Sequence, residues 1–392
     1  MNELYKYGIF GFGERPTGSE NNQRATDFVA EEAVRAGFRV QRLPFTCTYW
    51  QKGSSRAERG GMGVEVFAGP YSPALDTTGE IAEAGTLDEL KALDCEEKIL
   101  LVHGVLAREP LAPRDFPFYY PDEHKAVYET LDEKKPAAVV AVTGPHPSCG
   151  LNPFPWIEDE TFALPSAFLD EGAAAALRAA QGPVRLRIDS RTESRLGEQI
   201  VAMKKATGSA AGKIVICAHM DTAYGTPGAL DNASGVAVLL NAMEGLKDYA
   251  GPMDLEFVPF NGEDSGGVKG ELAYLAEHGA DFGRIRLVVN IDSPGSKGST
   301  THVSAYNLDD PRQAWLDGQI ARQSRVARGP EWVEGDHSIF AFQGVPALAV
   351  TSSDLRERIM KVSHTLADTP ELVDFSMLEE AGAFVAELVR QF

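Results

Sequence analysis

Five short segments in the second half of the chain place acids and histidines beside small, turn-forming residues. They are AHMDT (218–222), ALDNASG (229–235), NGEDSG (261–266), NIDSPG (290–295) and SHTLADT (363–369). Together they offer five candidate metal ligands and one candidate base, Glu263. The candidate ligands are His219, Asp231, Asp264, Asp292 and His364. Imidazole and carboxylate ligands without thiolate favour a catalytic zinc, cobalt or manganese ion over a structural zinc, which prefers cysteine.

Most of these acids have a structural explanation when each is taken alone. Asp231 fits an acid near a helix N-terminus, and Asp292 fits a turn before Pro294. His219 and His364 are harder to explain in that way. Their joint placement favours a catalytic or metal-binding role over a structural one, because functional groups in open α/β sheets gather at the carboxyl ends of strands. Three predicted strands are followed or ended by such residues: His219 and Asp221, Glu263 and Asp264, and Asp292.

The residue types predict a hydrolytic site with two metal ions. A pair of ions needs a bridging group, and the carboxylate of Asp231 is our choice. A bridged pair activates a water molecule and polarises a carbonyl group. Glu263 would take a proton from that water and pass it to the leaving amine. Asp221, two residues from His219, would accept the second ring N–H of that histidine and fix its tautomer.

The elements that position these residues alternate between apolar strands and amphipathic helices. The strands are predicted at 197–205, 213–219, 253–260, 285–292, 299–305 and 345–351, and the helices at 232–247, 267–278, 310–324 and 371–391. This alternation predicts an α/β fold with a mostly parallel, buried central sheet. A helix at 19–36, with Ser19 as N-cap and Gly37 as its stop, precedes a further strand.

The first residues of the chain are too few to form a domain by themselves, and this determines the predicted domain organisation. Residues 1–45 have no core of their own, so we assign them with 196–392 to one discontinuous catalytic domain. Residues 46–195 would form a smaller, β-rich insertion. Its predicted elements are strands at 98–104, 137–144 and 184–190 and a helix at 171–180.

Composition narrows the class of protein. The net charge of −20 would repel nucleic acid and anionic membranes, so neither is expected as a partner. We expect no signal peptide, no membrane span and reduced cysteines, and therefore a cytoplasmic protein. Five further histidines, which lack acids at a useful spacing, are predicted to be structural or surface residues: His103, His124, His146, His278 and His302. The pair Asp336-His337 fits a pocket wall or a structural turn equally well.

The candidate residues follow one another along the chain in the order HMD, LDN, Glu-acid, Asp and His. This order resembles that of the co-catalytic di-zinc exopeptidases, which include bacterial leucyl aminopeptidases and glutamate carboxypeptidase II. The glutaminyl cyclases are one-zinc relatives of the same family. The resemblance implies a three-layer zinc-exopeptidase fold with a mixed sheet and two Zn²⁺ ions, for which Co²⁺ or Mn²⁺ can substitute. His219 and Asp292 would bind one ion, Asp264 and His364 the other, and Asp231 both. Asp264 stands where many members have glutamate.

The segments KILLVHG, AAVVAVTG and ALPSAFLDEGAAAALR resemble a protease-associated domain, which would be the insertion. The resemblance favours an aminopeptidase acting on peptide or N-acyl and aminoacyl substrates. A carboxypeptidase or amidohydrolase on the same scaffold is the alternative. Arg356 and Arg358 could then bind a substrate carboxylate, but solvated surface charge is the favoured interpretation of both arginines. A one-zinc glutaminyl cyclase and a catalytically silent binding protein rank lower. The sequence leaves the oligomeric state open.

Overall fold

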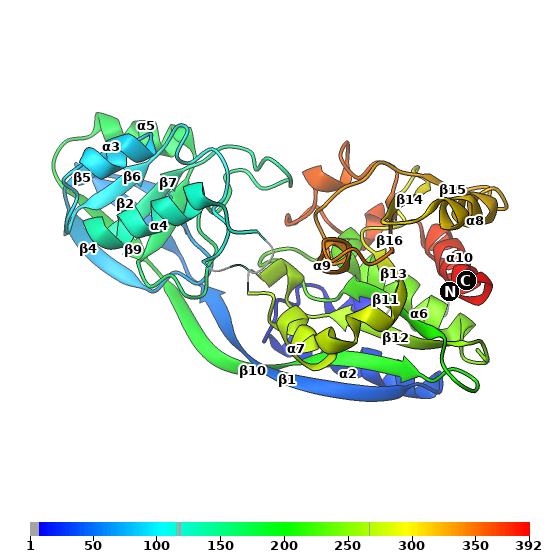
Figure 1. Ribbon diagram of the computed structural model, residues 1–392. Coiled ribbons are helices and arrows are strands. Elements are labelled where there is room, and N and C mark those ends of the chain that lie inside the picture. Colours follow the sequence, from blue (N-terminus) through cyan, green and yellow to red (C-terminus); the bar gives the residue numbers. More distant parts are fainter. Residues whose placement is uncertain (1–7, 115, 117–118, 266) are drawn as a thin grey trace. The chain divides into compact units, whose positions relative to one another are not determined.

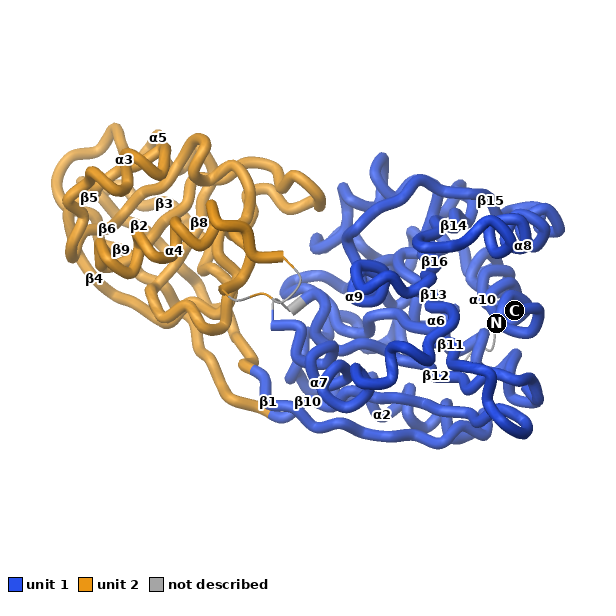
Figure 2. Tube along the Cα trace, in the orientation of Figure 1, with its two compact units in different colours: residues 1–47, 196–392 blue, residues 48–195 orange. Residues whose placement is uncertain are grey.

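The computed structural model describes residues 8–114, 116, 119–265 and 267–392 (Figure 1). The chain divides into two compact units (Figure 2). Unit 1 comprises Met1–Cys47 and Leu196–Phe392, and unit 2 comprises Thr48–Arg195. Unit 1 is therefore built from two separate stretches of chain.

The centre of unit 1 is a mixed sheet with the strand order β1-β10-β12-β11-β13-β16-β14-β15. The strands are β1 (Arg39–Lys52), β10 (Ser190–Lys204), β11 (Gly212–His219), β12 (Met253–Phe260), β13 (Ile285–Ile291), β14 (Thr301–Tyr306), β15 (Val326–Arg328) and β16 (Ala347–Ser352). The four strands β12, β11, β13 and β16 run parallel, whereas β10 and β14 are antiparallel to their neighbours β12 and β16. The prediction of a mostly parallel, mixed α/β sheet is confirmed.

Helices cover both faces of this sheet, because alternate side chains of each strand point to opposite faces. Phe257 of β12 belongs to the large apolar core that also includes residues of α2 (Glu20–Arg35), α6 (Gly235–Gly245) and α10 (Phe375–Gln391). Phe260, on the other face, contacts Tyr274 of α7 (Lys269–His278) and Phe340 of α9 (His337–Ala341). Helix α8 (Asp310–Ile320) follows β14. The three-layer arrangement is that of the predicted fold class.

Helix boundaries follow local capping chemistry. The Ser19 side chain accepts the N–H of Asn22 at 3.1 Å, and Gly37 has φ +78°, so α2 begins and ends as predicted. Helix α6 begins at Gly235, three residues later than predicted, because the segment before it is irregular. Helix α10 begins at Phe375, where Asp374 caps it, instead of at 371.

Unit 2 contains a second sheet with the strand order β4-β9-β2-β3-β8-β7-β6-β5. Its strands are β2 (Ser55–Arg59), β3 (Met62–Ala68), β4 (Leu75–Gly79), β5 (Ile81–Ala84), β6 (Ile99–Val102), β7 (Ala138–Val142), β8 (Ser166–Leu169) and β9 (Val184–Ile188), and its helices are α3 (Leu87–Ala92), α4 (Asp122–Lys134) and α5 (Glu171–Ala179). Helix α4 was not predicted. Its signal was present, because Val127, Tyr128 and Leu131 are buried at helical spacing.

Two further expectations concern the chain as a whole. Within the described ranges, no helix combines the length and the apolar character that crossing a bilayer requires. Within the part of the chain that the structure describes, Cys47, Cys95, Cys149 and Cys217 form no disulfide bond.

Candidate metal centre

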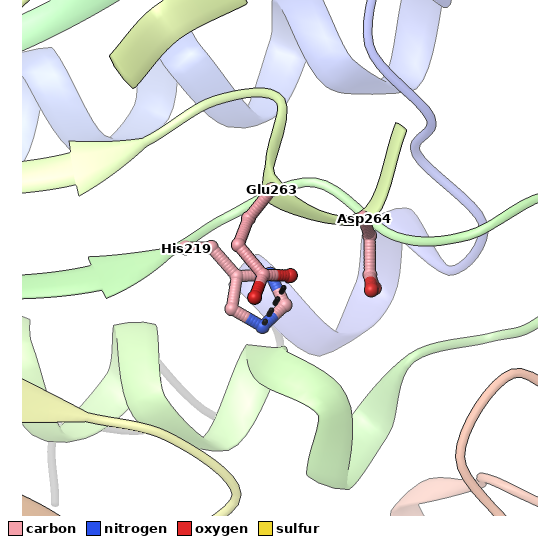
Figure 3. Close-up of side chains that lie close together, drawn as sticks. All are labelled: His219, Glu263 and Asp264. Atoms are coloured by element: carbon pink, nitrogen blue, oxygen red, sulfur yellow. Dashed lines mark ion pairs between the residues drawn. The ribbon is translucent and has the colours of Figure 1, made fainter. Parts of the chain in front are cut away.

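Three neighbouring parallel strands bring the first candidates together. His219 is the last residue of β11, Asp292 directly follows β13, and the turn Glu263–Ser265 follows β12. Because β12, β11 and β13 are adjacent and parallel, their carboxyl ends lie at one edge of the sheet. Figure 3 shows His219 and Glu263 directed toward each other, with Asp264 beside them.

Asp231 and His364 complete the cluster from two loops. Asp231 lies in the irregular segment Ala229–Ser234, and its peptide bond to Asn232 is cis. His364 lies between β16 and α10, with φ +62°. Neither position belongs to a regular element, so each depends on contacts made far along the chain.

Asp231 lies between the two histidines and offers one oxygen to each. Its Oδ1 is 3.1 Å from Nε2 of His219, and its Oδ2 is 3.3 Å from Nε2 of His364. Asp292 Oδ1 lies 3.8 Å from His219 Nε2, and Asp264 Oδ1 lies 2.9 Å from His364 Nε2. The structure thus forms two three-residue groups with metal-binding spacing, and Asp231 belongs to both.

Glu263 stands beside this pair of groups. Its Oε2 is 4.0 Å from His219 Nε2, and with His219 and Asp264 it makes a third group of the same kind. Burial, and then the charges of Asp264 and Asp336, raise the pKa of Glu263 well above its usual range, against the opposing effect of His219. Such a carboxyl group is suited to accept and return a proton.

The donor set fits two divalent cations. Asp231, Asp264, Asp292 and Glu263 carry four formal negative charges beside two imidazoles. Burial opposes a charge on His219, but Glu263 and the neighbouring aspartates outweigh it and raise the pKa of this histidine well above its usual range. Buried charge of one sign requires compensation, and cations bound by carboxylate and imidazole provide it.

Asp221 does not make the contact that the sequence predicts. Its Oδ1 is 3.9 Å from Nδ1 of His219, which is longer than a hydrogen bond. Its two oxygens instead accept the backbone N–H groups of Gly262 at 2.9 Å and of Asp264 at 3.2 Å. Fully buried Asp221 therefore holds the turn that carries Glu263.

Arg15 is a second positioning residue, and sequence reasoning missed it. Its side chain is fully buried. Nε donates to the carbonyl oxygen of Met220 at 2.7 Å and Nη2 to that of Gly228 at 3.0 Å, while its backbone N–H donates to Thr222 Oγ1. Burial lowers the pKa of Arg15 to about 10, so its charge is retained at neutral pH. The N-terminal segment is thereby tied to the loops after β11.

Asp368 was also missed, although it lies in the segment SHTLADT. Its Oδ1 accepts the N–H of Leu230 at 2.7 Å, and its Oδ2 accepts the N–H of Asp231 at 3.0 Å. Burial, and then the charge of Asp231, raise the pKa of Asp368 to about 7. Asp368 thus fixes the backbone of the residue that both metal-binding groups share.

Two more buried acids lie near the cluster. Asp336 and Glu271 are 2% and 1% exposed, and their carboxylate oxygens have no hydrogen-bond partner within the described part of the chain. Burial, and the nearby Asp292 among other acids, raise the pKa of Asp336 to about 8. His337 is fully buried, and its Nε2 lies 2.9 Å from the carbonyl oxygen of Trp332. Of the pair Asp336-His337, the histidine is a structural contact.

Two sequence interpretations gain detail from the structure. His103 and His278 have acidic neighbours, since Glu83 lies 3.8 Å from His103 and Glu256 lies 3.6 Å from His278. Each acid is at least twenty residues away along the chain, so no local spacing indicates either pair. Arg358 is engaged with the backbone, because its Nη1 donates to the carbonyl oxygen of Lys297 at 2.6 Å.

The amino-acid sequence is similar to that of known peptidases. Residues 199–389 match the model of peptidase family M28. The chain is 25% identical over 293 residues to a "probable lipoprotein aminopeptidase" of Mycobacterium tuberculosis, a match that covers 71% of this chain and 55% of that protein. The chain spans about half the length of the curated relatives it matches.

Solved structures show the same fold. An aminopeptidase from Aneurinibacillus sp. strain AM-1 superposes with a TM-score of 0.76 at 22% identity, covering 100% of this chain and 93% of that one. A zinc aminopeptidase from Bacillus subtilis gives a TM-score of 0.75 at 18% identity, with 99% and 93% covered. The segment 199–389, which matches the model of peptidase family M28, contains every residue of the two candidate metal-binding groups, and the chain shares its fold with these solved aminopeptidases.

Proposed function

We propose that this protein is a zinc-dependent exopeptidase, and specifically an aminopeptidase that releases N-terminal residues from peptides. The observation that carries the proposal is the pair of three-residue groups that share Asp231, with Glu263 beside them. The match of residues 199–389 to the model of peptidase family M28, and the similarity to proteins named as aminopeptidases, support the choice of reaction.

His219, Asp231 and Asp292 would hold one zinc ion, and Asp231, Asp264 and His364 the other. Cobalt or manganese suits the same nitrogen and oxygen donors. Bound zinc would supply Lewis acidity, which polarises the scissile carbonyl group and lowers the pKa of a water molecule. Asp221, Asp368 and Arg15 would keep the loops that carry these ligands in place.

Glu263 would accept the proton of the attacking water and deliver it to the leaving amine. The raised pKa of Glu263 suits the interval between the two steps, in which the carboxyl group has to hold the proton. Asp221 supports this role by fixing the turn on which Glu263 stands.

The remaining sequence interpretations stay predictions. Thr48–Arg195 is proposed to be a protease-associated domain on the resemblance of its strands and helix. A cytoplasmic location is likewise a prediction. A one-zinc glutaminyl cyclase is disfavoured, because the residues for two ions lie together.

Metal analysis joined to a substrate screen tests the proposal. The protein is purified with zinc, its metal content is measured, and it is assayed on aminoacyl anilides and on matched N-acetylated anilides. We expect about two zinc ions per chain and hydrolysis only of the substrates with a free amine. Preferential hydrolysis of N-acetylated substrates, or one firmly bound ion in an active enzyme, would contradict it.

A further inference from the structure

A small pocket lies at the carboxyl end of β16, one strand along the sheet from Asp292. Its floor is the face of β14 and β16 on which His302 and Thr351 are cross-strand partners. The segment 329–332 covers that face, since a Cβ atom at Gly329 would lie 2.9 Å from His302 Cβ. The volume of about 70 Å³ has room for a few water molecules or one short polar group.

Two lining residues carry buried polar atoms that lack partners. Trp332 Nε1 and Thr351 Oγ1 have no hydrogen-bond partner among the residues that the structure describes. Trp332 is 6% exposed and Thr351 3% exposed, and neither polar atom is open to solvent in this arrangement, so both side chains have to turn toward the pocket for a ligand to reach these atoms. The indole N–H is a donor only, and an unpaired buried donor is unfavourable until an acceptor arrives. The lining therefore favours a ligand rich in acceptor oxygens.

Arg356 adds a positive charge at the mouth of the pocket. Its side chain is exposed, and within the described ranges it makes no hydrogen bond or ion pair. Arg358, two residues away, differs because its guanidinium is bonded to the Lys297 carbonyl. The one carboxylate among the lining residues, Glu357, is also exposed. Charged and neutral donors thus outnumber the acid around this cavity.

Trp332 connects the pocket to the candidate metal centre. A Cβ atom at Gly335 would lie 3.1 Å from Cζ3 of Trp332 and 3.2 Å from Oδ2 of Asp292, so the indole lies beside that carboxylate. The backbone of Trp332 is held in place, because its backbone N–H donates to Tyr306 Oη at 2.8 Å. Trp332 is therefore a neighbour of both the pocket and the candidate ligand Asp292.

We propose that this pocket binds a carboxylate of the substrate, with Arg356 as its cation and Trp332 and Thr351 as its neutral donors. Arginine and carboxylate form strong, directional hydrogen bonds. The proposal rests on the proposed peptidase function and adds a substrate class to it. The carboxylate has two possible sources: the side chain of an N-terminal aspartate or glutamate, or the C-terminus of a short peptide.

Paired substrates that differ only in charge test the first source. kcat/KM is measured for the p-nitroanilides of glutamate and glutamine with the zinc-loaded wild type, Arg356→Gln and Arg358→Gln. We expect the wild type to favour glutamate, and we expect Arg356→Gln to lower the glutamate-to-glutamine ratio about tenfold. Arg358→Gln, which removes the same charge from the same loop, leaves the ratio within about twofold. Glu357→Gln raises it.

The second source is tested with alanyl-alanine and alanyl-alanine amide. If Arg356→Gln lowers only the ratio of dipeptide to amide, the pocket binds the C-terminal carboxylate. An unchanged ratio for both pairs, or an equal fall in Arg358→Gln, overturns the proposal. Melting curves followed by circular dichroism show that each variant is folded.

A further experiment distinguishes an error in the proposed peptidase function from an error in the proposed carboxylate site. If the zinc-loaded wild type hydrolyses none of these four compounds, the pocket is tested by calorimetric titration with glutarate. Binding to the wild type that is weakened about tenfold in Arg356→Gln, and also in Thr351→Val, supports the carboxylate site. Absence of glutarate binding to the wild type, or equal binding to Arg356→Gln, overturns it.

Discussion

Asp368 accepts the backbone N–H of Asp231 at 3.0 Å and so holds the residue that both metal-binding groups share. Replacement of Asp368 by Asn leaves one acceptor oxygen for the two N–H groups of Leu230 and Asp231. We expect activity to fall about 10- to 100-fold, as for other residues that orient metal ligands. Steady-state kinetics and zinc content after dialysis measure the effect. Asp309→Asn, which alters only the N-cap of α8, is the control, and an equal loss there would contradict the assignment.

Glu263→Gln separates proton transfer from metal binding. The amide keeps the size of the side chain but cannot accept a proton, so we expect kcat to fall about 10²- to 10⁴-fold with zinc content unchanged. The two readouts are kcat on an aminoacyl anilide and the zinc-to-protein ratio. A Gln variant that hydrolyses at nearly the wild-type rate would rule out the proposed base.

Asp264→Asn tests whether the two metal positions are distinct. Asp264 Oδ1 lies 2.9 Å from His364 Nε2, whereas His219 and Asp292 lie on the other side of Asp231. We expect the stoichiometry to fall by about one zinc ion per chain, because a neutral amide binds zinc poorly. Asp292→Asn is the matched variant for the other position. Loss of both ions from each variant would show a single cooperative centre instead.

His124 makes unit 2 sensitive to acid. Burial lowers the pKa of His124, and its Nδ1 accepts the N–H of Ala112 at 2.9 Å, which requires the neutral ring. The folded-state pKa is below the unfolded value of about 6.5, so the stability from this group is present above pH 6.5 and is lost as the pH falls through the folded-state pKa. Chemical denaturation of the protein at a series of pH values, compared with His124→Gln, measures this dependence. An identical pH dependence in the variant would contradict it.

The parts of the site that could be read from sequence share one property: the signal is local. His219 and Asp292 each end an apolar run, and Glu263 follows one, so strand prediction alone places them at one sheet edge. Arg15 and Asp368 were missed because their roles depend on backbone groups 213 and 137 or 138 residues away. No local pattern marks such a contact.

The structure also gives a different role to one residue that the sequence identified, Asp221. Asp221 was assigned from its spacing to His219, yet its oxygens accept the N–H groups of Gly262 and Asp264. Spacing shows that two residues are near each other, but the direction of each side chain is set by the turn that follows β12. His302, predicted to be structural or surface, is the cross-strand partner of Thr351 and lines the pocket beside it.

The discontinuity of unit 1 has a consequence for biosynthesis. Arg15 leaves the ribosome about two hundred residues before the carbonyl groups of Met220 and Gly228 that receive its side chain. Thr48–Arg195 has its own sheet and core and is complete before those carbonyls exist. Because domains generally fold as units during synthesis, unit 2 folds first. The N-terminal segment that carries Arg15 can make its contacts only after residues 220 and 228 have been synthesised. The candidate metal-binding cluster therefore forms only when nearly the whole chain, up to His364 and Asp368, has been translated.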